Sequence, residues 1–444
     1  MKYQLSLMST ALSIILLLQS VNAQEKDTTE TMSLAKIWEL ASTYNQQLKL
    51  QGLRQVAARL AVIEAKDRYL PTLSLTGDFK LNTKFLLYPN GLFSTAQDVP
   101  VQTYGYGLGY NLNLNLYNGG LDKGNVKIKE EEQLASHFAY ELQHSNIKYL
   151  AAIAYYELYK LMEFNNFIAS EITAERRQLT IIENLYKNGI VLKSDVLRIA
   201  VKLDNLELSQ SEVLKKMDVN KQKLNVLMGR EEMKSLRITA QENLSASQHT
   251  GCSYPDYVDL AAQQSPEFKI LESAVKTSEL QVKQVKSGTL PKLFLYSNYS
   301  YSYPQISFYP YSTDLWGFGQ TGLKMQWSID NAIKSKHTVA QAKLYNDEQR
   351  AILQVKREEV NLKIREIFLQ HQQAAQRVAT AEKNIAQSTE AVRVIKNSYL
   401  NQESLLTDLL EAENMLLEAK FKRITALVEL KLNSIQLQAI TGTL

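Results

Sequence analysis

Four segments of the chain alternate between apolar and polar residues with a period of two. In the clearest, residues 104–116, one side carries only Tyr and Leu and the other only Gly and Asn. The pattern predicts strands at about 72–86, 103–117, 292–303 and 318–329. A transmembrane β-barrel strand needs one apolar and one polar face over this length, although a half-buried soluble strand alternates as well. The strand lengths and the aromatic residues near their ends favour the membrane barrel.

Helical patterns fill most of the remaining chain, which has only 17 Gly and 8 Pro in 444 residues. We predict helices at Leu34–Leu70, with Ser33 as N-cap and Pro71 as the stop, and at Leu192–Met228. Two longer helices are predicted at about 120–187 and 330–398, each roughly 100 Å long at ~1.5 Å per residue. Along the second long helix, spacings of three and four alternate as in a coiled-coil seam. The seam residues are Val378, Ala381, Ile385, Ser388, Val392, Ile395 and Tyr399.

The order of these elements repeats, which indicates an internal duplication. Leu70-Pro71 recurs as Leu290-Pro291, and Ser194-Asp195-Val196-Leu197 recurs as Thr407-Asp408-Leu409-Leu410. Each half therefore contains a helix, a proline, two strands, a very long helix, a break and a final helix.

The N-terminus has the features of a secretory signal peptide. Lys2 is followed by the apolar run Ala11–Leu18 and by small residues before Gln24, so residues 1–23 are predicted to be removed. The run is too short to anchor the chain by spanning a membrane. The exported chain would contain a first repeat at 24–229, a connector or equatorial region at 230–256 and a second repeat at 257–444.

Composition and charge exclude several classes of protein. The formal net charge of +4 among 96 charged side chains is no nucleic-acid footprint. The only cysteine, Cys252, excludes an internal disulfide. Beyond the first twenty residues, no run of 18 apolar residues predicts a membrane-spanning helix.

Four strands are too few to close a barrel, and an open sheet edge is not tolerated in lipid. The chain is therefore expected to oligomerise, and twelve strands from a trimer would enclose a water-filled lumen. The two shorter helices of the first repeat match the long one when stacked end to end. The sequence thus predicts a mostly α fold with β, in which a long antiparallel α-helical barrel continues a transmembrane β-barrel with four strands per protomer.

The sequence offers little for catalysis, metal binding or cofactor binding. Of the five histidines, only His137 and His144 lie near each other, and a surface stripe explains them better than a metal site. Neither a CxxC pair nor a glycine-rich phosphate loop occurs. We predict no enzyme, no metal and no cofactor. Aromatic residues crowd residues 296–318, as in an interfacial girdle with extracellular loops, although a carbohydrate-binding strip is an alternative.

With this plan, the chain resembles the TolC-like outer-membrane efflux protein family. The duplicated order, the Leu-Pro before each first strand and the turns around Gly189 and Thr407 carry the resemblance over the whole mature chain. The resemblance implies a homotrimer in the outer membrane of a Gram-negative bacterium, in contact with outer-membrane lipid. It further implies a helical tunnel into the periplasm, a periplasmic adaptor protein and an inner-membrane pump. Gln402 replaces a usual glycine, and Ser404 stands where some members carry an arginine that locks the closed tip.

The resemblance also indicates where function resides. Asp408 and Glu411, three apart on one helix face, match a family pair that narrows the closed aperture. Six carboxylates around a trimer axis would attract cations, and the alternative is a solvated acidic patch. In the first repeat, Asp195 and Arg198 are placed to pair with each other. The two turns are predicted to dock the adaptor, or simply to cap and pack their helices; the residues concerned are Gly189, Ser194, Asp195, Leu197, Thr407 and Leu410.

The sequence therefore predicts a passive exit duct of a tripartite efflux or secretion system. The alternative from another class is a secreted, coiled-coil-rich structural or adhesive protein, which would be water-soluble without detergent. Drug efflux and protein secretion use similar ducts, and the sequence leaves both open.

Overall fold

A computed structural model describes residues 31–239, 253–306 and 310–444. Outside them lie the predicted signal peptide, residues 240–252 of the predicted connector, with His249 and Cys252, and the loop residues Phe308 and Tyr309. The described chain forms two compact units, one of residues 31–46, 146–239 and 367–439 and the other of residues 47–145, 253–366 and 440–444. Within these residues, no helix has both the length and the apolar character needed to span a membrane.

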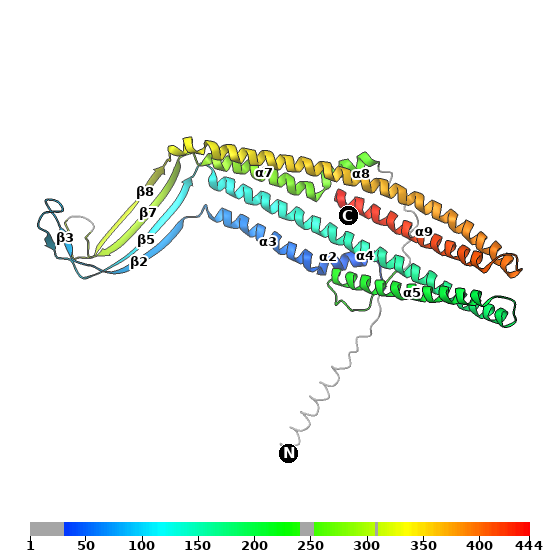
Figure 1. Cartoon of the computed structure of the whole chain (residues 1–444). Coiled ribbons are helices and arrows are strands. Elements are labelled where there is room, and N and C mark those ends of the chain that lie inside the picture. The colour runs from blue at the N-terminus through cyan, green and yellow to red at the C-terminus, as the bar shows by residue number, and fades with distance from the viewer. Residues whose placement is uncertain (1–30, 240–252, 307–309) are drawn as a thin grey trace, which may run out of the picture. The chain divides into compact units, whose positions relative to one another are not determined.

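The second unit contains an antiparallel four-stranded sheet in the order β2-β5-β7-β8 (Figure 1). The strands are β2 (Thr72–Leu81), β5 (Tyr104–Tyr117), β7 (Lys292–Tyr303) and β8 (Trp316–Gln326). The first predicted strand, 72–86, ends five residues early. Past Leu81, the Asn82 side-chain amide donates to the Gln102 carbonyl at 3.0 Å, and residues 85–99 form a separate hairpin. Its strands are β3 (Phe85–Leu87) and β4 (Gln97–Val99).

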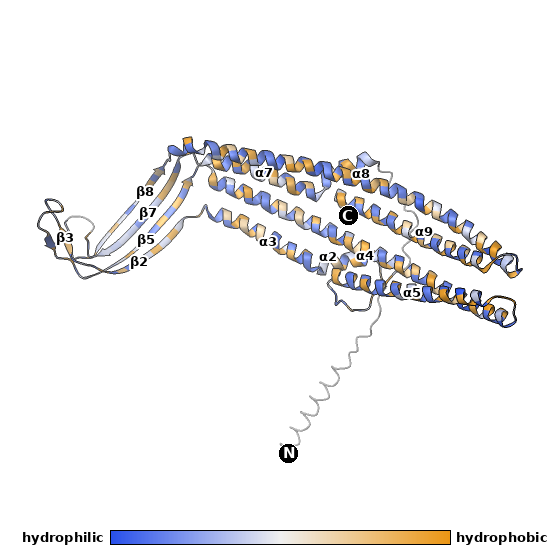
Figure 2. Cartoon of the chain, in the orientation of Figure 1, coloured by the Kyte–Doolittle hydropathy of each residue, from blue (hydrophilic) through white to orange (hydrophobic). Residues whose placement is uncertain are grey.

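The strand register places most of the apolar residues of the four strands on one face. Figure 2 shows apolar and polar residues alternating along the strands. Leu112 of β5 lies opposite Leu73, and Leu295 of β7 lies opposite Leu323 of β8. This apolar face is open in the single chain, with Leu75 79% and Leu323 65% exposed. Such exposure over a whole sheet face indicates that a lipid or protein surface covers it.

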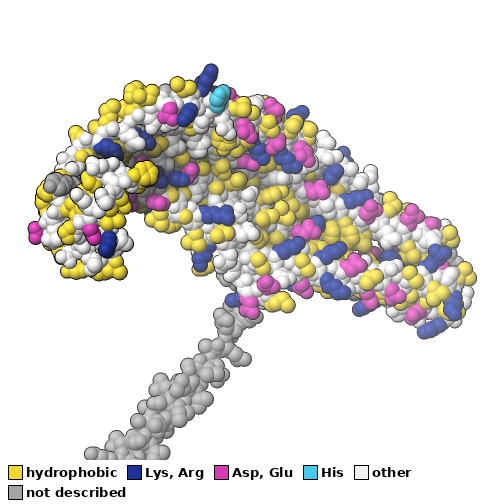
Figure 3. Space-filling model, turned by 60° about the vertical axis from the view of Figure 1, so that its left-hand side comes forward, with side chains coloured by type: hydrophobic (Ala, Val, Ile, Leu, Met, Phe, Trp, Pro, Cys, Tyr) yellow, Lys and Arg dark blue, Asp and Glu magenta, His cyan; other side chains and the backbone are white. Residues whose placement is uncertain are grey.

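The other sheet face carries mainly Gly, Asn, Ser and other polar residues, with the aromatic residues Phe294, Tyr296, Trp316 and Phe318 among them. Asn111, Asn298 and Gln320 lie side by side across three strands. Charged side chains are sparse over the strands and frequent over the helices, where both signs intermingle (Figure 3).

Aromatic residues mark both ends of the sheet. At the end that leads to the β3–β4 hairpin, the Tyr303 ring packs on Tyr104 and Tyr106, with centroid distances of 5.7 and 5.0 Å. At the end that leads to the helices, Tyr117 and Trp327 are about half exposed. Two aromatic levels separated by a strand length are typical of membrane-barrel girdles.

Each repeat contains one very long helix. These are α4 (Leu121–Lys187) and α8 (Asp330–Leu400), of 67 and 71 residues, and each contributes residues to both units. They are followed by α5 (Lys193–Leu227) and α9 (Leu406–Thr441). The predicted fold class, mostly helical with long strands in two repeats, is confirmed.

The predicted helix 34–70 is wrong in one respect, because the chain forms two helices there, α2 (Leu34–Tyr44) and α3 (Gln46–Asp67). Asn45 between them is extended, and its side-chain amide donates to the Leu227 carbonyl at 2.9 Å. The second repeat breaks in the same way at Ser265, between α6 (Tyr254–Gln264) and α7 (Pro266–Ser287).

A glycine lies against each of these two breaks, so the duplication seen in the sequence is also present in the structure. Gly229 has φ +67°, and a Cβ there would lie 2.5 Å from the Tyr44 carbonyl oxygen. Gly442 has φ +80°, and a Cβ there would lie 2.6 Å from the Gln264 carbonyl oxygen. Only glycine combines a left-handed backbone with so close an approach.

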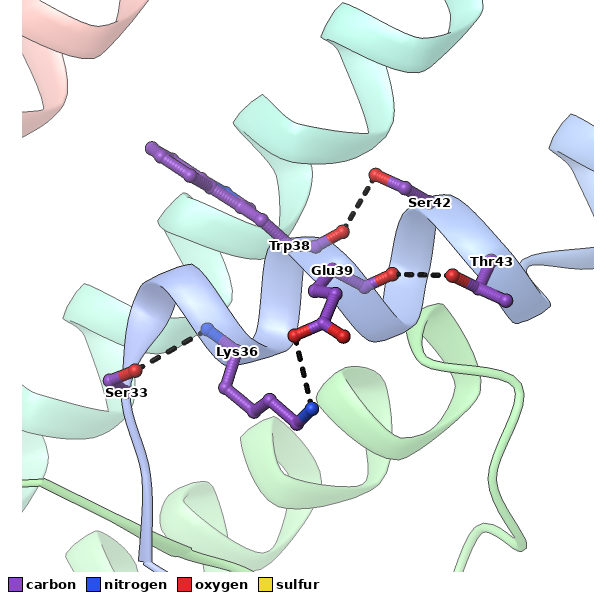
Figure 4. A network of polar contacts seen from close by, with 6 residues as sticks. All are labelled: Ser33, Lys36, Trp38, Glu39, Ser42 and Thr43. Atoms are coloured by element: carbon purple, nitrogen blue, oxygen red, sulfur yellow. Dashed lines mark hydrogen bonds and ion pairs between the residues drawn. The ribbon is translucent and has the colours of Figure 1, made fainter.

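Helix α2 is the first helix of the first unit, and hydrogen bonds fix its start and its contact with α4. Ser33 Oγ accepts the Lys36 backbone N–H at 3.3 Å, which confirms the predicted N-cap (Figure 4). Trp38, labelled in the same view, donates its indole N–H to the Lys148 carbonyl at 2.8 Å. A short parallel pair, β1 (Thr31–Met32) with β6 (Arg237–Ile238), lies beyond the cap.

The core of the first unit is a set of apolar seams between its helices. Leu161, Ile168 and Ile172 of α4 pack against Leu206 and Val213 of α5. Phe164 stacks on Phe421 of α9 with a centroid distance of 4.3 Å. Every residue of the predicted seam from Val378 to Tyr399 is buried or half-buried, so lateral packing stabilises these long helices.

Candidate functional site

The candidate site lies in the first unit, where the long helices end and the chain turns back. Both turns have the same hydrogen bonds. The Ile190 N–H donates to the Leu185 carbonyl at 2.9 Å, and the Glu403 N–H donates to the Ser398 carbonyl at 2.8 Å. This six-to-one bond is a Schellman motif, which needs a left-handed residue just before the donor. That residue is Gly189 (φ 72°) in the first repeat and Gln402 (φ 66°) in the second.

Gln402 therefore holds a strained backbone at the second turn, because a side chain in the left-handed region costs roughly 1–2 kcal/mol. We expect Gln402→Gly to raise the free energy of unfolding by about 0.5–1 kcal/mol, the gain being reduced by the extra freedom of glycine in the unfolded chain. Thermal unfolding of the purified protein measures this. Gly189→Gln is the reciprocal control and should destabilise by a similar amount; a destabilised Gln402→Gly variant would contradict the assignment.

The first turns of α5 and α9 are capped in the same way. The Asp195 carboxylate accepts the Leu192 N–H at 3.4 Å, and the Asp408 carboxylate accepts the Leu405 N–H at 3.2 Å. The capping interpretation thus holds for Asp195 but not for Ser194, which lies exposed inside the first helical turn. Asp195 is engaged in this cap, and among the described residues no ion pair joins it to Arg198, contrary to our expectation.

The predicted adaptor-docking residues divide into exposed and packed ones. Gly189, Ser194, Leu197 and Thr407 are exposed, whereas Leu410 packs against a buried cluster below the turns. That cluster is formed by Ile182, Ile199 and Leu406. A packed apolar base lies beneath exposed residues that are small or polar, such as Gly189 and Thr407, or apolar, such as Leu197. This end of the helices can contact a partner, and docking itself stays a prediction.

Tyr399 lies at the edge of the same packed cluster. Burial, together with the nearby Asp195 carboxylate, raises the pKa of the Tyr399 phenol. The phenol thus remains neutral at physiological pH and contributes no charge to the turns.

Asp408 and Glu411 are both exposed and share a groove between α8 and α9 of about 200 Å³. The groove is lined by Ser388, Ala391, Ile395, Asp408, Glu411, Ala412 and Met415. Within the described chain, neither carboxylate forms an ion pair with a basic side chain. The pair is therefore a negative patch on one side of α9 without a basic partner, although the Asp408 carboxylate also caps the helix through Leu405 N–H.

A buried charge cluster was not predicted from the sequence. It consists of Glu171 and Glu175 of α4, Lys202 of α5 and Glu413 of α9, and is called the Lys202 cluster below. The Lys202 ammonium contacts Glu175, lies 2.7 Å from a Glu413 oxygen and lies 3.6 Å from a Glu171 oxygen. The Lys202 side chain is 10% exposed and the Glu175 side chain 1%.

Burial dominates the electrostatics of this cluster. It raises the pKa of Glu171 and raises the pKa of Glu175 to about 7, against the lowering effect of Lys202. For Lys202, burial lowers the pKa, but hydrogen bonds to Glu175 and Glu413 outweigh it and the net pKa is raised. Lys202 therefore remains a cation, and Glu175 is the member that titrates near neutral pH.

The three glutamates are also the group within the described chain whose oxygens could surround a metal ion, all within 4.8 Å of one another. The histidine pair does not converge on one point. His137 lies 3.0 Å from the Gln55 amide and 3.3 Å from Glu141, while His144 stacks on Tyr140.

Residues 257–443 match the family model described as Outer membrane efflux protein. The matched residues span the second repeat of this chain, so that repeat is similar to the proteins of that family. The resemblance to the TolC-like proteins that the sequence indicates is confirmed. A search of curated proteins gives no match.

Solved structures are similar to the whole described fold. The outer-membrane channel OprN aligns with a TM-score of 0.79 at 15% identity, covering 92% of this chain and 90% of that one. VceC from Vibrio cholerae aligns with a TM-score of 0.75 at 17% identity, covering 92% and 95%. The Campylobacter jejuni CmeC outer membrane channel aligns with a TM-score of 0.75 at 16% identity, covering 92% and 85%. At these identities the likeness establishes the fold of both repeats.

Proposed function

We propose that three copies of this chain form an outer-membrane channel-tunnel that serves as the passive exit duct of a tripartite efflux or secretion system. The observation that carries the proposal is the four-stranded sheet, with one largely apolar face that has exposed residues on every strand and one mostly polar face opposite. Twelve such strands would close a barrel that presents the apolar face to lipid and the polar face to water.

The helical part supplies the periplasmic tunnel of this proposal. Its long helices carry charges of both signs on their exposed faces and pack through apolar seams, which suits a wall in contact with water. The exposed turns around Gly189 and Gln402 are the surface offered to a periplasmic adaptor, and an inner-membrane pump would supply the energy. The match of residues 257–443 to the Outer membrane efflux protein family model, and the similar channel structures, support this assignment to the outer membrane of a Gram-negative bacterium.

The aperture is assigned to Asp408 and Glu411. Their carboxylates have no basic partner and lie on one side of α9 near its start, so three copies would bring six carboxylates around the axis. Such a ring attracts cations and disfavours anions.

Planar-bilayer recording tests this function directly. We expect the wild-type protein to form cation-preferring channels, and Asp408→Ala with Glu411→Ala to weaken that preference and the block by multivalent cations. A matched control removes two exposed carboxylates of α5, Asp204→Ala with Glu212→Ala, and should keep the selectivity. Unchanged selectivity in the aperture variant would contradict the assignment of Asp408 and Glu411 to the aperture. If the wild-type protein formed no channels, the proposed duct function would be contradicted.

A further inference from the structure

The Lys202 cluster joins the two repeats within the first unit. Lys202 of α5 reaches Glu175 of α4 in its own repeat and Glu413 of α9 in the other repeat. It lies two helical turns beyond Asp195, close to the helix ends that form the proposed periplasmic tip. Any separation of α5 from α9 at the tip must break the Lys202–Glu413 ion pair.

The charges in this cluster do not balance. Three carboxylates face one ammonium, and one Glu175 oxygen, Oε2, is buried with no hydrogen-bond partner. Two other cations lie nearby. The charge of Lys420 on α9 lowers the pKa of Glu171, and Arg198 of α5 lines the same pocket as Lys202. If all three carboxylates were ionised, Lys202 would face three negative charges, with Lys420 acting on only one of them, in a largely buried site, which is costly.

A proton fits this site better than a metal ion. The Lys202 ammonium already lies among the oxygens that would bind a metal. A divalent cation at ordinary ligand distances would stand directly beside that positive charge, and the two would repel. A proton on the unpartnered oxygen adds one positive charge and needs no additional space.

We propose that Glu175 carries a proton in the stable state of the cluster, and that loss of this proton weakens the contact between α4, α5 and α9. The cluster is then a pH-sensitive clamp between the two repeats. The clamp does not depend on the proposed function, whereas its consequence, a tip that opens more readily as pH rises, does rest on it.

The direction follows from the shift of Glu175 from its ordinary pKa of 4.5 to about 7. A raised carboxyl pKa means that the folded state prefers the proton. Its contribution to stability is fully present below pH 4.5, declines as pH rises and is lost above about pH 7.

Thermal unfolding of the detergent-solubilised full chain between pH 5 and 8.5 tests the clamp without any channel measurement. The apparent melting temperature of the wild type should fall with pH relative to that of Glu175→Gln, which mimics the protonated side chain. Glu183→Gln, an exposed change on the same helix, should keep the wild-type dependence. A Glu175→Gln profile that parallels the wild type would overturn the proposal.

Amide hydrogen exchange provides a local measurement. At pH 8 we expect exchange over residues 193–206 and 405–413 to be slower in Glu175→Gln than in the wild type, on the order of 10- to 100-fold, since each pKa unit is a tenfold factor. Equal exchange in both proteins would contradict the clamp. Stabilisation of the wild type, but not of Glu175→Gln, by added Mn²⁺ at pH 8 would show a metal site instead and would also overturn it. Neither result depends on whether the protein conducts ions.

Discussion

Leu108→Arg should prevent assembly of the channel, whereas Asn111→Arg on the same strand should not. Leu108 lies mid-strand on the apolar sheet face and is 62% exposed in the single chain, while Asn111 points to the polar face. Near the middle of a membrane, an arginine on the lipid side of a barrel costs about 2–4 kcal/mol, and a trimer incurs that cost three times.

The same pair of variants separates the two classes of function. In a secreted soluble protein, Leu108 would be an ordinary exposed residue, and its replacement would change stability by only about ±0.5 kcal/mol. Heat-stable trimers in the outer-membrane fraction measure the outcome. Wild-type amounts of trimer for Leu108→Arg would refute a lipid-facing role for this sheet face.

Lys202→Met should destabilise the helical unit by about 3–5 kcal/mol, because it leaves buried carboxylates without their cation. Lys215→Met, on an exposed face of the same helix, should change stability by only about ±0.5 kcal/mol. The apparent melting temperature of the purified protein reports both changes.

A second substitution shows whether lost charge, and not lost packing, causes the effect. At pH 8, where the wild-type Glu175 is ionised, adding Glu175→Gln to Lys202→Met removes the most buried negative charge and should restore part of the stability. Additive losses in the double variant would show instead that the two side chains act independently.

The sequence predicted the features that depend on local patterns. The alternation of apolar and polar residues over 104–116 predicts β5. The absence of proline over residues 120–187 and 330–398 predicts the long helices, and the recurring Leu-Pro and turn motifs identify the two repeats. Ser33 and Asp195 were predicted as capping residues because capping depends on neighbours along the chain.

Features that depend on distant contacts were missed. The break at Asn45 carries neither glycine nor proline, and it depends on a hydrogen bond to Leu227, far along the chain. The Lys202 cluster is spread over three helices, and nothing in the sequence indicates that Glu413 approaches Lys202. The β3–β4 hairpin was read as the end of a longer strand, since Phe85 continues the alternation of β2.

The central claim is that three copies of this chain close one barrel in the outer membrane. Native mass spectrometry of the protein extracted from membranes in detergent measures the number of chains in the assembly. The account predicts three chains per particle and no folded protein in the detergent-free soluble fraction. A single-chain particle that is soluble without detergent would contradict it.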